Sequence, residues 1–306
     1  MNKFAFLFPG QGSQSVGMMA GFANNTIIIN TFKEASDILG IDFWQMVTEP
    51  NELLNQTTNT QPIMLAAGVA TWRAWSAINS AIPAVMAGHS LGEYSALVAA
   101  EALTFADALP LVRYRAEVMQ SAVPDGVGAM AAILGLDDAT VLAVCAEAAQ
   151  GEVLEAVNLN SPGQVVIAGH QAAVERGMVL AKEKGAKRAL ALPVSVPSHC
   201  ALMKPAADKL REYLATVNIS TPKIPVLHNA DVLAYTETAQ IKDALVRQLY
   251  SPVRWVETIQ AIAALGVINT AECGPGKVLT GLTKRIVSDL PCVALVNDEA
   301  LNTFSQ

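Results

Sequence analysis

The stretch over residues 84–100 constrains the fold of this chain more than any other part of its sequence. Four apolar residues lead into the pentapeptide Gly-His-Ser-Leu-Gly at 88–92, and a helix-forming run follows at once. A strand, a serine between two glycines and a helix, in this order, predict a sharp strand-to-helix turn around Ser90, where both glycines leave room for neighbouring backbone. Such turns stand at the end of a strand in a parallel sheet, so the pattern favours an α/β fold.

The same turn makes Ser90 a candidate nucleophile. Its hydroxyl is expected at the N-terminus of the following helix, where free N–H groups and the helix dipole stabilise an oxyanion. The backbone N–H of Leu91 is the first candidate donor to that oxyanion. A glycine-rich turn over 9–17 follows the first strand, and its Gln11 N–H is the second candidate. This turn is not a dinucleotide fingerprint, because the third glycine of G-x-G-x-x-G would fall on Ser15.

A serine nucleophile needs a base, and histidine has the suitable pKa. Of the four histidines, His199 lies on an irregular loop, which suits a group that faces a cleft. We expect His89 and His228 to be packed or hydrogen-bonded structurally, and His170 to lie on the surface or cap a helix. Three acids follow downstream, and none falls in a loop between Ser90 and His199: Asp208, Asp231 and Asp243. A carbonyl oxygen that accepts from the imidazole Nδ1–H is the alternative to a triad acid.

Short apolar runs alternate with longer amphipathic runs along the chain, which is typical of parallel α/β structure. Strands are predicted over residues 3–8, 84–88, 225–228, 267–272 and 292–296. Helices are predicted over residues 60–79, 91–100, 104–121, 238–249, 254–265 and 277–288. Together these elements predict an α/β-hydrolase-like body built on a parallel sheet.

The middle of the chain follows another order. Strands over 127–134, 153–159, 164–169 and 187–192 and helices over 138–149 and 171–184 succeed one another as β-α-β-β-α-β, with a turn over 160–163. This is the ferredoxin-like arrangement. We therefore expect a small ferredoxin-like subdomain over 125–195, inserted into a large catalytic domain made of 1–124 and 196–306. Hinges are expected at 124–126 and 193–197, which are rich in residues that interrupt regular structure.

Composition argues against several classes of protein. The chain has 306 residues with a net charge of −7, which argues against nucleic acid as a general partner. Its four cysteines form no C-x-x-C pair, so neither a zinc site nor a disulfide framework is expected, and a reducing compartment fits. No apolar run is long enough for a signal-peptide core or a membrane span. We expect a cytoplasmic protein without a membrane partner.

Five motifs occur along the chain: PGQGSQ at 9–14, GHSLGEY at 88–94, NSPGQ at 160–164, PSH at 197–199 and GPGKVL at 274–279. Their order and spacing resemble those of the malonyl-CoA:acyl carrier protein transacylases, the loading enzymes of bacterial fatty-acid synthesis. The resemblance covers nearly the whole chain, to about residue 297.

This resemblance implies that Ser90 carries a malonyl ester and that His199 is the general base. It implies that the His199 Nδ1–H is held by the backbone carbonyl of Gln248, so that no aspartate is needed. The N–H groups of Gln11 and Leu91 would form the oxyanion hole. The substrates would be malonyl-CoA and acyl carrier protein, with no metal or organic cofactor, and we expect a monomer.

The helix predicted over 104–121 carries two arginines that are candidates to face a cleft. Its apolar stripe comprises Phe105, Leu109, Val112, Ala116 and Met119. At about 100° per residue, Arg113 and Arg115 fall on opposite flanks of this stripe, so periodicity leaves the choice open. The resemblance selects Arg115, whose guanidinium fork would bind the free carboxylate of malonate and select malonyl over acetyl thioesters.

Three other functions stay open on the residues alone. A serine hydrolase would release free acid without an acceptor. An acyltransferase of a polyketide synthase would differ in its carrier and, through Ser198 beside the base, in its preference between malonyl and methylmalonyl groups. A non-catalytic scaffold would have no chemical reason to keep this set of polar residues together. An acidic carrier would meet basic residues near the cleft, for which Lys187 and Arg188 are candidates.

Overall fold

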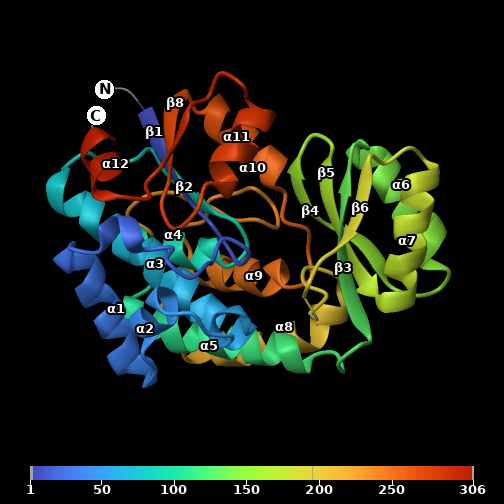
Figure 1. The fold of residues 1–306 in the computed structure, drawn as a ribbon, viewed down its shortest axis with the longest axis horizontal. Helices are drawn as coiled ribbons and strands as arrows, with labels where there is room; N and C mark the ends of the chain where they lie inside the picture. The colour runs from blue at the N-terminus through green and yellow to red at the C-terminus, as the bar shows by residue number, and fades with distance from the viewer. Residues whose placement is uncertain (1–2, 195, 305–306) are drawn as a thin grey trace.

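The computed structural model describes residues 3–194 and 196–304, which form two separate sheets with their own helices (Figure 1). The larger sheet is parallel, with the strand order β7-β2-β1-β8-β9. Its strands are β1 (Lys3–Phe8), β2 (Val85–Gly88), β7 (Val226–Leu227), β8 (Val267–Glu272) and β9 (Cys292–Ala294). All five correspond to predicted strands, although β9 ends before the predicted residue 296.

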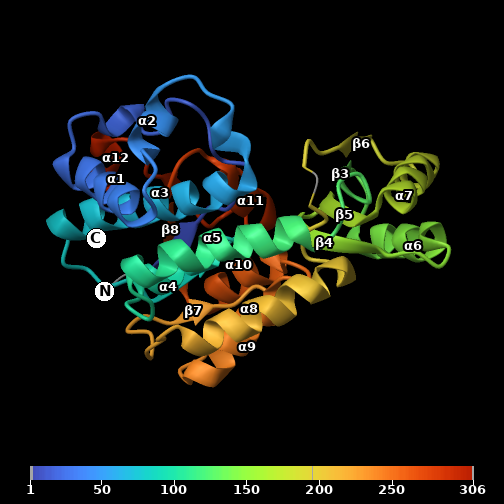
Figure 2. The ribbon, with the colours of Figure 1, turned by 90° about the horizontal axis from the view of Figure 1, so that it is seen from below.

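Alternate side chains of the central strand β1 enter two different cores. Phe4, Phe6 and Phe8 pack against α3 (Thr57–Ile78), α4 (Gly92–Ala99) and α5 (Phe105–Ser121). Ala5 and Leu7 point to the other face, which α10 (Trp255–Ala264) and α11 (Val278–Ile286) cover. A parallel strand that is covered on both faces reads as one continuous apolar run, which explains the sequence of β1. Figure 2 shows these helices from below.

Helix α9 (Thr238–Gln248) completes the six predicted helices of this part. Four more have no predicted counterpart: α1 (Thr26–Leu39), α2 (Phe43–Thr48), α8 (Lys204–Thr216) and α12 (Asp298–Thr303). Short 3-10 turns lie at Ala20–Phe22, Leu53–Asn55 and Ala201–Met203. For α1 the signals were in the sequence, because Asn25 caps its start and Gly40 ends it with a φ of +69°. No helix among the described residues has the length and apolar character to cross a bilayer.

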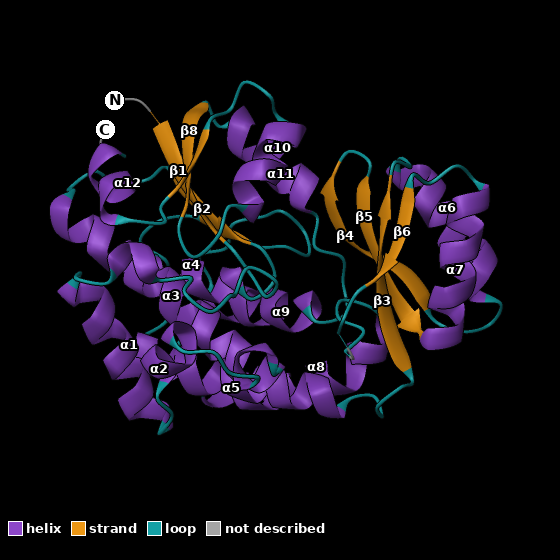
Figure 3. Ribbon diagram, viewed as in Figure 1, coloured by secondary structure: helices purple, strands orange, loops and turns teal. Residues whose placement is uncertain are grey.

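The second sheet is antiparallel, with the order β4-β5-β3-β6. Its strands are β3 (Gly128–Leu134), β4 (Leu154–Ser161), β5 (Gln164–His170) and β6 (Arg188–Ala191). Helices α6 (Asp138–Ala149) and α7 (Gln171–Glu183) pack on its outer side (Figure 3). The predicted four-residue turn over 160–163 is wrong by two residues, because Asn160 and Ser161 belong to β4 and only residues 162–163 turn.

Strand β4 joins the small sheet to the larger body. Asn158 bridges Val253 in the loop before α10, where the Leu159 N–H donates to the Val253 carbonyl at 3.0 Å. Arg285 at the end of α11 donates to the Gln164 side chain at 2.6 Å. These contacts bring the end of β4 toward the elbow that follows β2. Of the two expected hinges, 193–197 includes residue 195, which lies outside the described residues.

Candidate active site

The turn after β2 has the steric properties expected of a strained elbow. Ser90 adopts a φ of +50°, in the left-handed region that side chains rarely occupy. A Cβ at Gly88 would lie 1.9 Å from the Gly92 carbonyl carbon, and a Cβ at Gly92 would lie 2.0 Å from the Phe8 carbonyl oxygen. Any side chain at either glycine would therefore displace the backbone that holds the serine.

Ser90 and His199 are brought together although 109 residues separate them in the chain. The Ser90 Oγ lies 2.8 Å from the His199 Nε2. On the other side of the ring, Nδ1 donates to the backbone carbonyl of Gln248 at 2.7 Å. A carbonyl only accepts, so the proton sits on Nδ1 and the lone pair of Nε2 faces the serine hydroxyl. His199 itself has a φ of +67°, a second left-handed residue at the same place.

The environment keeps this imidazole neutral. Burial lowers the pKa of His199 to about 3, and the positive charge of Arg115 acts in the same direction, while the hydrogen bond to Gln248 opposes both. A neutral imidazole at pH 7 is ready to accept the serine proton. None of the three downstream acids takes the place of a triad carboxylate. Asp231 and Asp243 bind Arg247, at 2.7 and 2.6 Å, and Asp208 is exposed.

The other three histidines have partners of their own. The His89 Nε2 lies 2.8 Å from the Asn160 Oδ1 at the end of β4, and its ring packs against Trp255. His170 accepts from the Val153 N–H through Nδ1 at 3.0 Å. His228 is buried, and its Nδ1 lies 2.6 Å from the Glu93 carboxyl group. None of them is in hydrogen-bond contact with the Ser90 side chain.

Arg115 is the arginine of α5 that faces Ser90. Its side chain is only 1% exposed, yet it forms no ion pair with any described acid. Nη1 donates to the Gln61 side chain at 2.6 Å, and Nη2 donates to the Gln248 side chain at 3.0 Å and to the Ser90 Oγ at 3.4 Å. Burial lowers the pKa of Arg115 from its ordinary value. Arg113 lies on the outer flank and pairs with Glu117.

The two candidate oxyanion donors come from loops that touch each other. A Cβ at Gly10 would lie 2.4 Å from the His89 carbonyl oxygen and 3.6 Å from the Leu91 nitrogen. Within the described residues, the backbone N–H groups of Gln11 and Leu91 donate to no protein acceptor. Two unused donors at adjoining strand ends are what an oxyanion hole requires.

Two residues in contact with the elbow were missed in the sequence. The Asn229 Oδ1 accepts from the Ser90 N–H at 2.7 Å, and its Nδ2 donates to the Gly88 carbonyl at 2.7 Å. Glu93 lies buried beneath them and accepts from the Asn229 N–H at 2.9 Å. Glu93 belongs to the elbow motif and Asn229 directly follows a strand, but no sequence rule brings these segments together.

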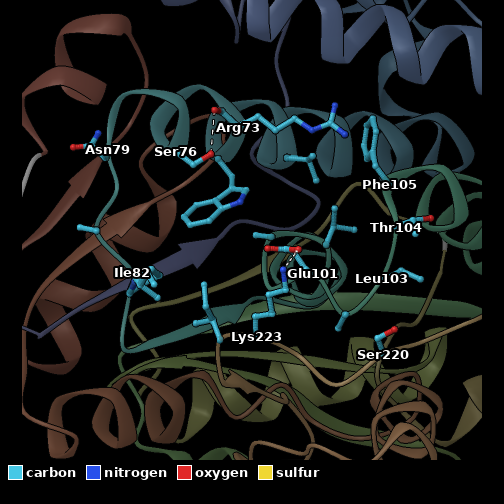
Figure 4. A pocket seen from close by; sticks show the side chains of 18 of the residues that line it. Arg73, Ser76, Asn79, Ile82, Glu101, Leu103, Thr104, Phe105, Ser220 and Lys223 are labelled. Carbon is cyan, nitrogen blue, oxygen red and sulfur yellow. Dashed lines mark hydrogen bonds and ion pairs between the residues drawn. The ribbon is translucent and has the colours of Figure 1, made fainter.

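A cavity of about 680 Å³ opens at the opposite end of α4, away from Ser90 (Figure 4). Trp72, Arg73, Phe105 and Lys223 are among its lining residues, and Lys223 pairs with Glu101. No candidate catalytic residue lines this cavity, so the chemistry described above does not take place there. Within the described residues no cluster of His, Cys, Asp and Glu is arranged to hold a metal ion.

Comparisons with known proteins agree with this geometry. The family model described as "Acyl transferase domain" matches residues 5–296. The malonyl CoA-acyl carrier protein transacylase of Salmonella typhimurium is 58% identical over 304 residues, which are 99% of this chain and 98% of the relative. The crystal structure of the acyl-carrier-protein S-malonyltransferase of Burkholderia pseudomallei superposes with a TM-score of 0.97 at 59% identity, covering 98% of each chain.

Another solved structure holds a malonyl-transacylase in complex with the acyl carrier protein of a type II polyketide synthase. It superposes with a TM-score of 0.97 at 53% identity, again over 98% of each chain. The resemblance inferred from the five motifs is thus confirmed over nearly the whole chain. The chain belongs to the acyl transferase family and, within it, to the malonyl CoA-acyl carrier protein transacylases.

Proposed function

We propose that this enzyme transfers the malonyl group of malonyl-CoA to the pantetheine thiol of an acyl carrier protein, through a malonyl ester on Ser90, in fatty-acid biosynthesis. One observation carries the choice of acyl group. Arg115 is a buried guanidinium that pairs with no acid among the described residues, and it contacts the serine oxygen that would bear the ester. In a malonyl ester on Ser90, one methylene group separates the ester carbonyl from the free carboxylate. This carboxylate would therefore lie close enough for the guanidinium fork to bind it.

In the first half-reaction, the Ser90 Oγ attacks the thioester carbonyl and its proton passes to the His199 Nε2. The carbonyl oxygen becomes an oxyanion, which accepts from the N–H groups of Gln11 and Leu91. The C–S bond then breaks, and the imidazolium returns its proton to the departing CoA sulfur. Malonyl-Ser90 and free CoA thiol result, and the imidazole is neutral again.

The second half-reaction reverses these steps with another thiol. His199 removes the proton of the carrier's pantetheine thiol, the thiolate attacks the ester carbonyl, and the same two N–H groups hold the oxyanion. Ser90 leaves and takes back the proton from Nε2. By holding the malonyl carboxylate, Arg115 keeps the acyl group in one pose and helps to keep water from the ester carbonyl.

The proposal also covers the domains of the chain, its compartment, its oligomeric state and its contact with the carrier protein. The larger sheet is assigned to an α/β-hydrolase-like body, 1–124 with 196–306, and the β-α-β-β-α-β unit over 125–195 to an inserted ferredoxin-like subdomain. The sheet order β4-β5-β3-β6 supports the second assignment. We further propose a cytoplasmic monomer that uses no cofactor beyond the CoA thioester, and the four free cysteines suit a reducing compartment. Exposed Lys187 and Arg188 would meet the acidic carrier.

Intact-protein mass spectrometry after incubation with malonyl-CoA tests the proposed function. We expect one added malonyl group, mapped by peptide analysis to Ser90, that persists until a carrier protein is added. Both a fatty-acid carrier and a polyketide carrier should be offered as acceptors. Ser90→Ala should take up no label. Labelling at another residue, or steady release of free malonate without any acceptor, would contradict the proposal and favour a hydrolase.

A further inference from the structure

Glu93 is a fully buried carboxylate in the first turn of α4 that the mechanism above does not use. It accepts three hydrogen bonds from two separate segments. The Nδ1 of His228 donates at 2.6 Å, the backbone N–H of Asn229 at 2.9 Å and the Nε2 of Gln248 at 2.9 Å. A carboxyl group buried this deeply is tolerated because three donors satisfy it.

Two of these donors lead directly to the reacting groups. The Asn229 side chain bonds to the Ser90 N–H and the Gly88 carbonyl, and so holds both sides of the strained elbow. Glu93 holds the backbone N–H of Asn229, and so helps to place this side chain against the elbow.

Gln248 makes the second link, and it acts on both partners of the nucleophile. Its backbone carbonyl orients the His199 imidazole at 2.7 Å, and its side-chain oxygen accepts from the Arg115 Nη2 at 3.0 Å. Its Nε2, which donates to Glu93, also donates to the Ser90 carbonyl at 3.0 Å. One residue, Gln248, therefore links the buried acid to the guanidinium through its side-chain amide and to the base through its backbone carbonyl.

We propose that Glu93 is a positioning residue for this reaction. Through Asn229 it fixes the elbow of Ser90, and through Gln248 it fixes the imidazole of His199. The side-chain amide of Gln248 also accepts from the fork of Arg115, so Glu93 contributes as well to the preference for a dicarboxylic acyl group. No described acid contacts the His199 imidazole directly, and Glu93 acts on it through the intervening Gln248. The inference rests on the proposed function, because it concerns the same serine and the same acyl group.

Two substitutions separate the hydrogen-bonding role of Glu93 from its charge. Glu93→Ala removes all three acceptor contacts. Glu93→Gln keeps a carbonyl oxygen for the two donors Asn229 and Gln248, and its amide can donate to His228 Nδ1 once that ring carries its proton on Nε2. This tautomer breaks no existing bond of the His228 Nε2, but it leaves that buried N–H without an acceptor among the described residues. The glutamine variant should therefore rescue most of what the alanine variant loses.

The measured quantity is the single-turnover rate of Ser90 malonylation at saturating malonyl-CoA, normalised to the folded fraction. For Glu93→Ala we expect a loss on the order of 10²-fold, because small misplacements of reacting groups have effects of that size. For Glu93→Gln we expect a loss of about tenfold or less, the value of roughly one hydrogen bond. The ratio of malonyl to acetyl transfer should fall in Glu93→Ala, which a merely structural acid would not cause.

Glu272→Ala is the matched control. Glu272 is equally buried and also accepts three hydrogen bonds, from Leu279 and Thr280, but it caps α11 and contacts no reacting group. Its loss should lower stability and leave the normalised malonylation rate unchanged. If folded Glu93→Ala malonylates at the wild-type rate with the wild-type selectivity, the inference fails. If wild-type enzyme itself takes up no malonyl group on Ser90, it is the proposed function that fails.

Discussion

Replacing Arg115 is the perturbation that tests the assignment of substrate most directly. In Arg115→Ala the guanidinium is lost, and the acceptors Gln61 and Gln248 lose the donor that they share. The alanine also leaves a cavity where one of the largest buried side chains had been. Arg115→Met fills most of that volume without a charge, so comparing the two variants separates the lost charge from the lost packing.

The size of the effect follows from the burial of the pair. A guanidinium and a carboxylate about 4 Å apart attract each other by about 4 kcal/mol at an effective dielectric constant of about 20. Truncating one partner of a buried charge pair costs about 2–5 kcal/mol. Since about 1.4 kcal/mol corresponds to a factor of ten, malonyl transfer should slow by about 30-fold to several thousand-fold. Acetyl transfer involves no carboxylate and should be spared or improved.

The assay is single-turnover acylation of Ser90, followed by quenching and intact-protein mass spectrometry, with malonyl-CoA and acetyl-CoA in parallel. Acetyl-CoA serves as the internal control, because damage to the elbow or to His199 would slow both reactions equally. Equal losses for the two thioesters in Arg115→Met would refute the carboxylate-binding role. A wild-type rate with malonyl-CoA in either variant would refute it as well.

The other predictions concern the base and the elbow. Because burial lowers the pKa of His199 to about 3, its imidazole is neutral over most of the acidic range. The acylation rate should therefore stay nearly level from about pH 8 to about pH 5. A rate that titrates near the ordinary histidine pKa of about 6.5 would contradict this expectation. Between these two pKa values the His199 imidazole is protonated in the unfolded chain and neutral in the folded chain. The free energy of unfolding should therefore fall by about 1.4 kcal/mol for each pH unit of acidification in that range. Urea unfolding at about pH 7 and about pH 4.5 measures this change, which should be absent in His199→Gln. Gly10→Ala should lose about 1–3 kcal/mol of stability and slow acylation, since its Cβ would lie 2.4 Å from the His89 carbonyl oxygen. A Cβ at Gly281 in α11 would meet no atom of the described residues within 4 Å, so Gly281→Ala should match or exceed the wild-type free energy of unfolding in urea.

Local sequence predicted the strands of both sheets, most of the helices and the elbow at Ser90. Gly88 predicts the elbow from local sterics, because a Cβ there would meet the backbone of Gly92 and Glu93. A Cβ at Gly92 would instead meet the carbonyl oxygen of Phe8 in β1, which is a contact between distant segments. The apolar stripe of α5 likewise predicts which face of that helix is buried. Helices α1 and α8 were missed although α1 carries its capping residues, which shows that caps need to be read together with apolar spacing.

Pairings across the chain were decided by the tertiary structure. Periodicity left Arg113 and Arg115 as equal candidates, and only the packing of α5 against α3 and the hydrogen bonds to Gln61 and Gln248 place Arg115 beside Ser90.

In the same way, the sequence by itself determined that a serine would stand on a bent backbone at a helix N-terminus. It did not determine that Asn229 and Gln248, from distant segments, would meet at Glu93 beneath that serine. The physical reason is that backbone sterics act between neighbours in the chain. Hydrogen bonds between segments more than a hundred residues apart exist only after the sheet has brought their strand ends to one edge.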